Sequence, residues 1–429
     1  MLTPHKIMLK QCQLAKMTAT CLYLSVSFFL NTAAIAEETN KNWLPEQLQW
    51  HVFGTLGASY HEEEGIGYRR SLEQKNSVQA NQLDFASDSL LGSQADLSIS
   101  EEFSSSLQVV SRNNSSGNWK PEVVSAFVKY KPSETLQFRI GRMPETSNLG
   151  GETRYVSYAY TQVRPSPEIY GLFSLYDRYD GVDAEYTSPF ATGIGKIIVN
   201  YGKTVGEFYL GDTSSQVNNV YNYGLVTSWQ KDNLELLGLF SVHHTKDQDS
   251  YEPLAASLDA TPFPLANQRA TEIRDSEDYK TYIYAASINY EFDAWKFQGV
   301  MTRSNTDSYF EINGKSGSAI IAYRAGKFTP YAITAYSKLT TKFKPIDIPN
   351  IPNPQLQALN SAYNYASNIF ERDINTLGLG LRYDIAENYA LKLQVDKINA
   401  KSDPVIMSTK PQGTNKDLTL LTIALDFLF

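Results

Sequence analysis

The sequence is poor in cysteine, and both of its cysteines, Cys12 and Cys21, lie near the beginning. Three lysines precede an apolar run over residues 19–30, and small residues follow at 34–36. This pattern predicts a secretory signal peptide over residues 1–36, because a positive start, a short apolar run and a small-residue cleavage site occur together. A short anchor helix is a poor match in length and in the residues that follow. After cleavage the chain would have no thiol, no disulfide and no cysteine-based metal site.

Basic residues and long hydrophobic runs are also scarce. Removal of residues 1–36 takes away three lysines and leaves 35 basic and 46 acidic residues, a formal charge of −11. An acidic chain of this kind argues against nucleic acid as a partner. After the first 36 residues no stretch approaches the roughly 20 apolar residues of a membrane-spanning helix. A soluble fold and a membrane β-barrel both remain open at this point.

Histidine is rare as well, and the motifs of catalysis are absent. After residue 36 the histidines are His51, His61, His243 and His244, and neither G-x-S-x-G nor H-E-x-x-H occurs. Adjacent residues of a strand point to opposite faces, so His243 and His244 would not share a metal. We expect both to be surface histidines. We also expect no catalytic residue, no metal site and no cofactor.

Aromatic residues and repeated alternation are what the sequence has in quantity. Aromatic residues make up 12% of the chain, including 28 tyrosines, and tyrosine suits strands that have one wet end and one apolar end. From residue 50 onward, segments of about ten residues alternate apolar and polar positions. This alternation predicts sixteen strands, over residues 50–60, 91–100, 103–112, 121–131, 134–143, 178–187, 194–203, 219–230, 233–243, 279–291, 294–304, 316–325, 327–339, 371–384, 387–400 and 417–429.

The segment 417–429 shows the alternation clearly. Its apolar face consists of Leu421, Ile423, Leu425, Phe427 and Phe429. Its other face is more polar and carries Thr422, Ala424 and Asp426. A buried strand of a soluble sandwich would have the same pattern, so the connections between strands must discriminate.

The predicted links alternate between short and long along the whole chain. Short links connect alternate pairs of strands, whereas the intervening links are longer and include 61–90, 143–177, 244–278 and 340–370. A Greek-key sandwich has no reason to follow this rhythm. It is typical of an up-and-down barrel with short periplasmic turns and long extracellular loops. The fold class is therefore predicted to be all-β, a transmembrane antiparallel β-barrel of about sixteen strands that spans residues 37–429.

Aromatic residues near the predicted strand ends, mostly beside short turns, fit the girdle of a membrane barrel. With this girdle, sixteen strands, alternating links and Phe429, the chain resembles the general porin superfamily of Gram-negative outer membranes. The local match is the strand LQFRIGR at residues 136–142 and the long link that follows it.

This resemblance implies an outer-membrane channel for passive diffusion of small hydrophilic solutes, assembled as a homotrimer. Its implied partners are outer-membrane lipid, lipopolysaccharide and the barrel-assembly machinery, with Phe427 and Phe429 as the assembly signal. The third long link, 143–177, would fold inward and constrict the channel; the alternative is a lid over the extracellular mouth. The open alternatives for function are a substrate-specific porin for a small acid, sugar or peptide, and a non-conducting barrel whose loops act as an adhesin or enzyme.

Charged residues on predicted lumen faces and on the third long link are the candidates for pore selectivity. They are Arg112, Arg139, Asp183, Glu185 and Arg382 on strands, and Glu145, Glu152, Arg154, Arg164 and Glu168 on the link. The resemblance implies an acidic loop facing a basic wall, with Glu145, Glu152 and Glu168 opposite Arg112, Arg139 or Arg382. The alternative for each is a solvated lumen residue.

Overall fold

The computed structural model describes residues 47–145, 151, 153–173, 176–210, 213–217, 219–246, 251–275, 278–308, 313–342, 346, 353–368, 371–402, 406–408 and 415–429. The chain divides into two compact units, Met1–Gln49 and Trp50–Phe429. The architecture below is that of the second unit. The predicted signal peptide over residues 1–36 lies outside the described residues.

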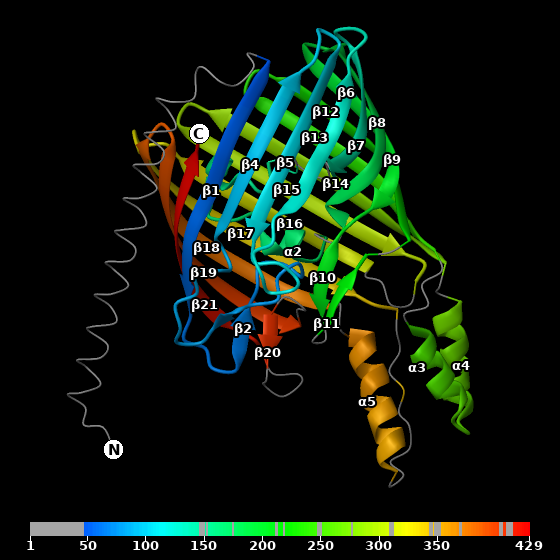
Figure 1. Ribbon diagram of the computed structural model, residues 1–429. Helices are drawn as coiled ribbons and strands as arrows, with labels where there is room; N and C mark the ends of the chain where they lie inside the picture. The colour runs from blue at the N-terminus through cyan, green and yellow to red at the C-terminus, as the bar shows by residue number, and fades with distance from the viewer. Residues whose placement is uncertain are drawn as a thin grey trace, which may run out of the picture. The chain divides into compact units, whose positions relative to one another are not determined.

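Sixteen antiparallel strands close into one barrel (Figure 1). All sixteen strands predicted from the alternation are present, and their ends differ from the prediction by at most three residues. The barrel strands are β1 (Leu48–Tyr60), β4 (Leu90–Ser98), β5 (Phe103–Arg112), β6 (Glu122–Tyr130), β7 (Leu136–Pro144), β8 (Arg178–Phe190), β9 (Gly193–Thr204), β12 (Val220–Lys231), β13 (Leu234–Thr245), β14 (Tyr279–Phe292), β15 (Trp295–Thr306), β16 (Asn313–Tyr323), β17 (Phe328–Thr340), β18 (Arg372–Ala386), β19 (Tyr389–Ser402) and β21 (Leu418–Leu428).

The barrel closes where β1 pairs with β21 in antiparallel register, from Phe53 opposite Leu428 to Tyr60 opposite Leu421. Beyond the end of β21, the Phe429 N–H donates to the Val52 carbonyl at 2.8 Å, and the Val52 N–H donates back at 3.0 Å. Closure leaves no open strand edge, which is the condition for a sheet that spans lipid.

The outer face of the barrel wall is apolar and the inner face is more polar, which reverses the arrangement in a soluble protein. On β14, Tyr284 and Ile288 point outward and are 42% and 44% exposed, whereas Thr281 and Ser287 point inward and are buried. Aromatic pairs such as Phe328 and Tyr383, with ring centroids 4.7 Å apart, lie outward beside the short turns. An apolar outer band with aromatic residues at its edge matches a lipid environment. No helix among the described residues is long and apolar enough to cross a membrane.

Two of the short turns contain an aspartate at positive φ. Asp232 and Asp293 begin the two-residue links after β12 and β14, with φ of 49° and 50°. Such turns match the twist of neighbouring strands and require a left-handed backbone, which aspartate adopts more easily than most residues. The turns thereby fix the register of β12 with β13 and of β14 with β15.

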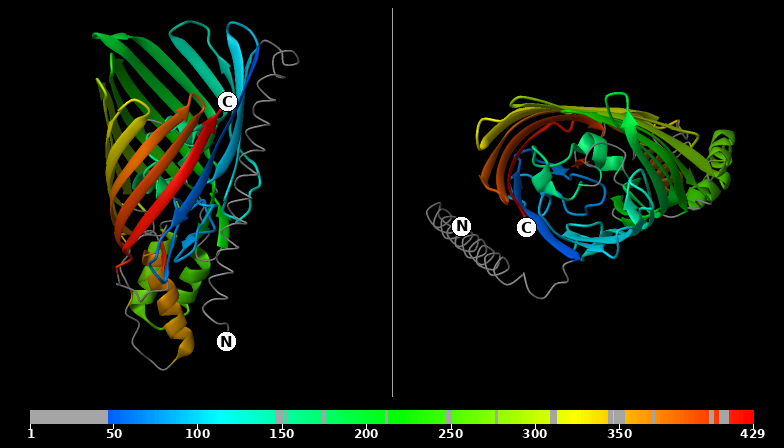
Figure 2. Two further views of the ribbon diagram at one scale, coloured as in Figure 1. Left: turned by 90° about the vertical axis from the view of Figure 1, so that its left-hand side faces the viewer. Right: turned by 90° about the horizontal axis from the view of Figure 1, so that it is seen from above.

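Other elements of the long links are short. The strands β2 (Ile66–Tyr68), β3 (Val78–Gln79) and β20 (Ile406–Ser408) form a three-stranded sheet, and β10 (Glu207–Leu210) pairs with β11 (Thr213–Gln216). The third long link contains η1 (Ser157–Ala159) and α2 (Pro167–Phe173). Seen along the barrel, α2 lies inside the ring of strands (Figure 2).

Two apolar clusters support the long links. Tyr68 of β2 and Ile406 of β20 pack against inward residues of β18, β19 and β21, including Ile374 and Leu420. The second cluster joins α3 (Glu252–Asp259), α4 (Pro264–Arg274) and α5 (Pro354–Asn368), which come from two different long links. The barrel interior is therefore partly packed at the loop end beside β18, β19 and β21.

Candidate pore constriction

Residues 153–173 of the third long link, here called the inner segment, are bound to one side of the barrel wall. The Lys392 ammonium group donates to the carbonyls of Ser157 and Gln162 at 2.7 and 3.0 Å. The Arg382 guanidinium donates to the carbonyls of Tyr158 and Tyr160 at 2.8 and 2.7 Å. Two inward-pointing cations, one on β18 and one on β19, thus donate hydrogen bonds to four backbone carbonyls that have no partner in a sheet.

Arg164 anchors the middle of the inner segment. It donates to both carboxylate oxygens of Asp88, at 2.8 and 2.9 Å, and to Asp396 of β19 at 3.0 Å. The side chains of Arg164 and Asp88 are each 2% exposed. Charge-assisted, bidentate hydrogen bonds of this kind fix orientation as well as distance. The inner segment is therefore held inside the barrel.

A second group of charges joins the inner segment to the first long link, residues 61–89. Glu73 accepts hydrogen bonds from Arg112 at 3.0 Å and from Arg154 at 2.9 Å, and Arg178 lies 3.5 Å away. Burial raises the pKa of the Glu73 carboxyl, but the surrounding guanidinium groups outweigh burial and lower this pKa to about 2. Glu73 is consequently charged, and it neutralises arginines from three separate parts of the chain.

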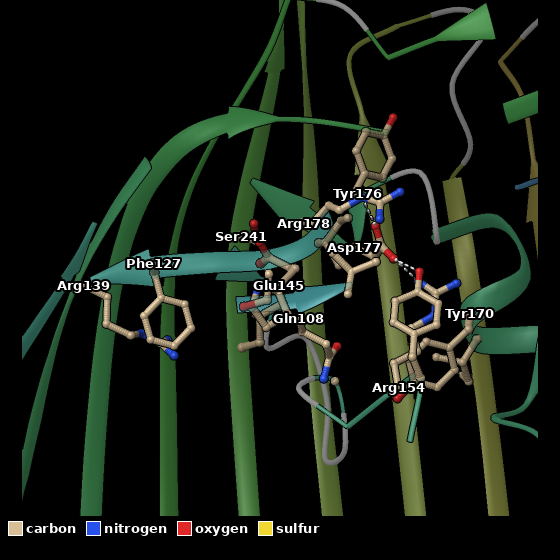
Figure 3. A pocket seen from close by; sticks show the side chains of 18 of the residues that line it. Gln108, Phe127, Arg139, Glu145, Arg154, Tyr170, Tyr176, Asp177, Arg178 and Ser241 are labelled. Carbon is tan, nitrogen blue, oxygen red and sulfur yellow. Dashed lines mark hydrogen bonds and ion pairs between the residues drawn. The ribbon is translucent and has the colours of Figure 1, made fainter. Parts of the chain in front are cut away.

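A cavity of about 170 Å³ remains between the inner segment and the opposite side of the wall (Figure 3). Polar wall residues, among them Gln94, Gln108 and Thr302, share its lining with Arg154 and Tyr170 of the inner segment. This arrangement makes the inside of the barrel asymmetric. One side is filled by bound backbone, and the other presents polar side chains together with apolar ones, including Leu239 and Ile283, to open space.

Glu145 lies in this cavity at the end of β7 and is 7% exposed. Its carboxylate accepts a hydrogen bond from the Asn222 amide at 2.7 Å. Burial raises the pKa of Glu145 to about 7; the hydrogen bonds of Asn222 and Ser241 oppose this effect, and the nearby negative charge of Asp177 adds to it. Among the described residues, no Lys, Arg or His forms an ion pair with Glu145.

The predicted site residues fall into separate groups. Glu145, Arg139 and Arg154 line the cavity. Arg164 and Glu168 lie where the inner segment meets the wall, and Glu168 accepts from the Thr376 hydroxyl. Three others are in ion pairs with neighbours: Asp183 with Arg139 at 2.8 Å, Glu185 with Lys196 at 3.3 Å, and Arg382 with Asp384 at 2.8 Å. Glu152 lies outside the described residues.

For Glu145 and Glu168, the observed contacts differ from the implied arrangement of loop acids against a basic wall. Arg112 faces Glu73 and Glu122, Arg139 faces Asp183, and Arg382 faces Asp384 and backbone carbonyls. Conversely, the arginines of the inner segment form ion pairs with acids from other parts of the chain. The reason is local: acids on the first long link and on neighbouring strands, and not Glu145 or Glu168, lie within contact distance of these arginines.

The prediction of two surface histidines is wrong for His243. Its side chain is buried, its Nε2 lies 3.1 Å from the Ser241 hydroxyl, and its ring packs against Tyr176 with centroids 4.5 Å apart. His244 instead points away and contacts Asp278. His243 occupies an inward position that Tyr176 covers, and its alternation with inward Ser241 is the signal that could have identified it. Among the described residues, no group of three or more His, Cys, Asp or Glu side chains could hold a metal ion.

A closed sixteen-stranded barrel with an apolar outer band, tight turns at one end and an inward-folded segment is a membrane barrel of the porin type, and such barrels belong to the bacterial outer membrane. No family model matches the chain, and no curated protein matches it. Among solved structures, OmpF of Salmonella typhi in complex with daunomycin is similar, with a TM-score of 0.53 and 11% identity over 89% of this chain and 97% of OmpF. OprB of Pseudomonas putida gives a TM-score of 0.51 and 9% identity over 89% and 94% of the two chains. The chain has the porin fold.

Proposed function

We propose that this protein is a channel for passive diffusion of small hydrophilic solutes across the outer membrane. The observation that carries the proposal is the one-sided attachment of the inner segment. Lys392 and Arg382 hold it against β18 and β19, so the cavity beside β4, β5 and β13 stays open, with polar and charged side chains as well as apolar ones in its lining. In a barrel of this size, the narrowest polar section sets which solutes pass.

An enzymatic role has little support in the cavity. Ser241 and His243 lie within hydrogen-bond distance, but a catalytic base of this kind is normally oriented by a third group. His243 Nδ1 has no partner among the described residues, and the nearby Glu145 interacts with Asn222 and Ser241 instead. We therefore propose that the protein is not an enzyme.

The homotrimer, the lipid and lipopolysaccharide contacts and the role of the barrel-assembly machinery are proposals that rest on the resemblance to porins. Cross-linking of the protein in outer membranes tests the assembly. A ladder that ends at three subunits supports the trimer, and a single monomer band under conditions that cross-link a known trimeric porin contradicts it.

Reconstitution in a planar lipid bilayer tests conduction. Purified, folded protein should produce stepwise current increases in potassium chloride solution, because the cavity is not filled by side chains and charged groups are part of its lining. A folded barrel that gives no steps at any voltage or salt concentration would overturn the channel proposal. The non-conducting alternative, with function in the external loops, would then be favoured.

A further inference from the structure

One part of the lumen wall beside the cavity is free of acids, lysines and arginines. It consists of inward residues of five neighbouring strands, β9, β12, β13, β14 and β15, and is here called the neutral panel. The strand register aligns its segments, which are residues 198–202, 222–226, 239–243, 281–285 and 302–306. The inward positions of these described segments hold glycine, aliphatic residues, neutral polar residues and His243, and none holds Asp, Glu, Lys or Arg.

The neutral panel offers aliphatic surface and hydroxyl groups side by side. Leu239 and Ile283 belong to an apolar cluster of the wall, and both line the cavity. Ser241 and Thr302 bring hydroxyl groups to the same cavity. A solute on this side of the constriction therefore meets uncharged groups of both kinds.

The arginines on the other sides of the cavity already have acidic partners. Arg139 pairs with Asp183 at 2.8 Å, and Arg154 pairs with Glu73 at 2.9 Å. Arg178 lies 3.5 Å from the same Glu73 carboxylate. A buried charge is stable when it is paired, so these arginines do not need a charged solute to balance them.

The two acids of the lining are also accounted for. Asp177 pairs with Arg154 at 2.5 Å. Glu145 accepts a hydrogen bond from Asn222, and burial raises the pKa of its carboxyl to about 7, so it is only partly ionised near neutral pH. The lining therefore has no strong excess of either sign.

Buried hydrogen-bonding atoms of both kinds nevertheless lack a partner within the described part of the cavity. Arg178 Nη1 must donate, Asp177 Oδ1 accepts, and Thr302 Oγ1 can do either. Asp177 and Arg178 lie together at the edge of the cavity (Figure 3). Buried polar atoms are normally satisfied. A hydroxyl group both donates and accepts, whereas an ammonium group only donates and a carboxylate only accepts. Hydroxyl groups are therefore the ligands that fit this mixed set.

We propose that the cavity binds uncharged polyhydroxylated solutes of monosaccharide size as they pass through the channel. This inference rests on the proposed channel function and specifies the solute class. The C–H face of a sugar ring fits the aliphatic surface of Leu239 and Ile283. The hydroxyl groups at its edge fit the unpaired atoms of Thr302, Asp177 and Arg178. The cavity volume of about 170 Å³ is below the roughly 300–1,000 Å³ of pockets for drug-sized ligands, which limits the solute to a small one.

Glucose is a suitable probe in planar bilayer recordings with potassium chloride. It should reduce the wild-type current along a saturating concentration curve, because a bound molecule excludes ions from the constriction. Glucuronate and glucosamine, compared at pH 6 where both are charged, should need about tenfold higher half-blocking concentrations, because their charge loses water without gaining a free partner. Triethylene glycol, a neutral solute of similar size with hydroxyl groups only at its ends, should reduce the current without saturation.

Thr302→Val tests the neutral panel directly. The substitution removes the unpaired hydroxyl group and keeps the shape of the side chain. It should raise the half-blocking concentration of glucose about threefold to tenfold, because one hydrogen bond is lost. Thr334→Val is the matched control, since it makes the same change at an exposed position on the outer face of β17. This control should leave the half-blocking concentration unchanged.

The outcomes separate this inference from the channel proposal. In a conducting channel, the inference is overturned if glucose gives no saturating block, if a charged sugar or triethylene glycol matches glucose, or if Thr302→Val behaves like the wild type. If the protein never conducts, equilibrium dialysis of the folded, detergent-solubilised wild type against labelled glucose still tests the site. Saturable binding that Thr302→Val weakens supports the inference, and the absence of saturable binding contradicts it.

Discussion

Arg164 and Asp88 form a buried, bidentate ion pair in which Nε and Nη2 donate to the two carboxylate oxygens at 2.8 and 2.9 Å. Arg164 lies in the inner segment, whereas Asp88 lies near the end of the first long link, just before β4. The pair therefore connects two long links inside one barrel. Arg154 and Glu73 make a second connection of the same kind at 2.9 Å. The constriction is consequently a joined structure of two links, each of which stabilises the position of the other.

Asp88→Asn should loosen this structure without blocking barrel formation. The asparagine keeps the shape but removes the charge opposite a buried guanidinium, which typically costs about 3–5 kcal/mol. Because Asp396 still contacts Arg164, we expect the lower end of that range. Urea unfolding of the detergent-solubilised barrel measures the change, and faster proteolysis within residues 153–173 reports the release.

Asp180→Asn is the matched control for this substitution. Asp180 pairs with Arg142 at 2.7 Å, but both side chains are about a third or more exposed, so the pair should contribute at most about 1 kcal/mol. Equal effects of the two substitutions would show that the buried pair does not hold the inner segment.

Replacement of residues 153–171 by a short glycine and serine linker should increase the single-channel conductance. The inner segment occupies space that water and ions would otherwise fill, and α2 lies within the ring of strands. Planar bilayer recordings measure the conductance directly. An unchanged value would place the narrowest section elsewhere, and the small sheet of β2, β3 and β20 would be the next candidate.

Asp426→Leu should strongly destabilise the seam of the barrel. The Asp426 carboxylate accepts from the Thr55 hydroxyl at 2.7 Å and lies 2.7 Å from the Lys392 ammonium, with both charged side chains fully buried. Removal of the acid leaves a buried, unpaired ammonium, at a cost of about 3–5 kcal/mol. The temperature at which the folded band disappears in gel mobility assays should fall accordingly.

The double substitution Asp426→Leu with Lys392→Met should recover much of this loss, because no charge then remains unpaired. Thr55→Val removes only a hydrogen bond and should cost about 1 kcal/mol. A double variant that is no more stable than Asp426→Leu would indicate that Lys392 acts mainly through its bonds to the inner segment.

The stability of the protein should decrease in acid through Glu73. Its folded-state pKa is lowered to about 2 by Arg112, Arg154 and Arg178, against 4.5 for an ordinary glutamate. A lowered pKa contributes stability that is present above the ordinary value and is lost as the pH falls from about 4.5 to 2. For a buried group this contribution is about 3 kcal/mol. Glu73→Gln should therefore destabilise the barrel at pH 7 and weaken the acid dependence, as measured by urea unfolding at pH 7 and pH 3.

Phe429→Ser tests the proposed assembly signal. The Phe429 ring packs edge-on against Tyr389 at 5.4 Å and lies 6.0 Å from the Phe427 ring, so serine removes an aromatic contact as well as a recognition feature. We expect less folded protein in the outer membrane of expressing cells, measured by heat-modifiable mobility. Tyr389→Ser controls for the lost packing. Wild-type amounts of folded Phe429→Ser would contradict the signal.

Much of the fold could be predicted from the sequence because the signals are local. Strand positions follow from period-2 alternation, as in β14, where Thr281 and Ser287 lie inward and Tyr284 and Ile288 lie outward. The alternation of short and long links determined the up-and-down topology, and the apolar face of residues 421–429 identified β21 as a membrane strand. The strand positions depend only on near neighbours in the sequence, and the link rhythm depends only on the order and spacing of the strands.

The contacts of the constriction could not be predicted in the same way, because they join distant parts of the chain. Arg112 and Glu73 are 39 positions apart, and Arg164 and Asp396 are 232 positions apart. Alternation places such residues in the lumen but does not say which charges meet. The sequence by itself thus determined that the chain forms a barrel and which face of each strand points inward. Only the tertiary structure decided that His243 is buried, that the arginines are neutralised and that Glu145 is not, because burial and ion pairing depend on which segments the closed wall brings together.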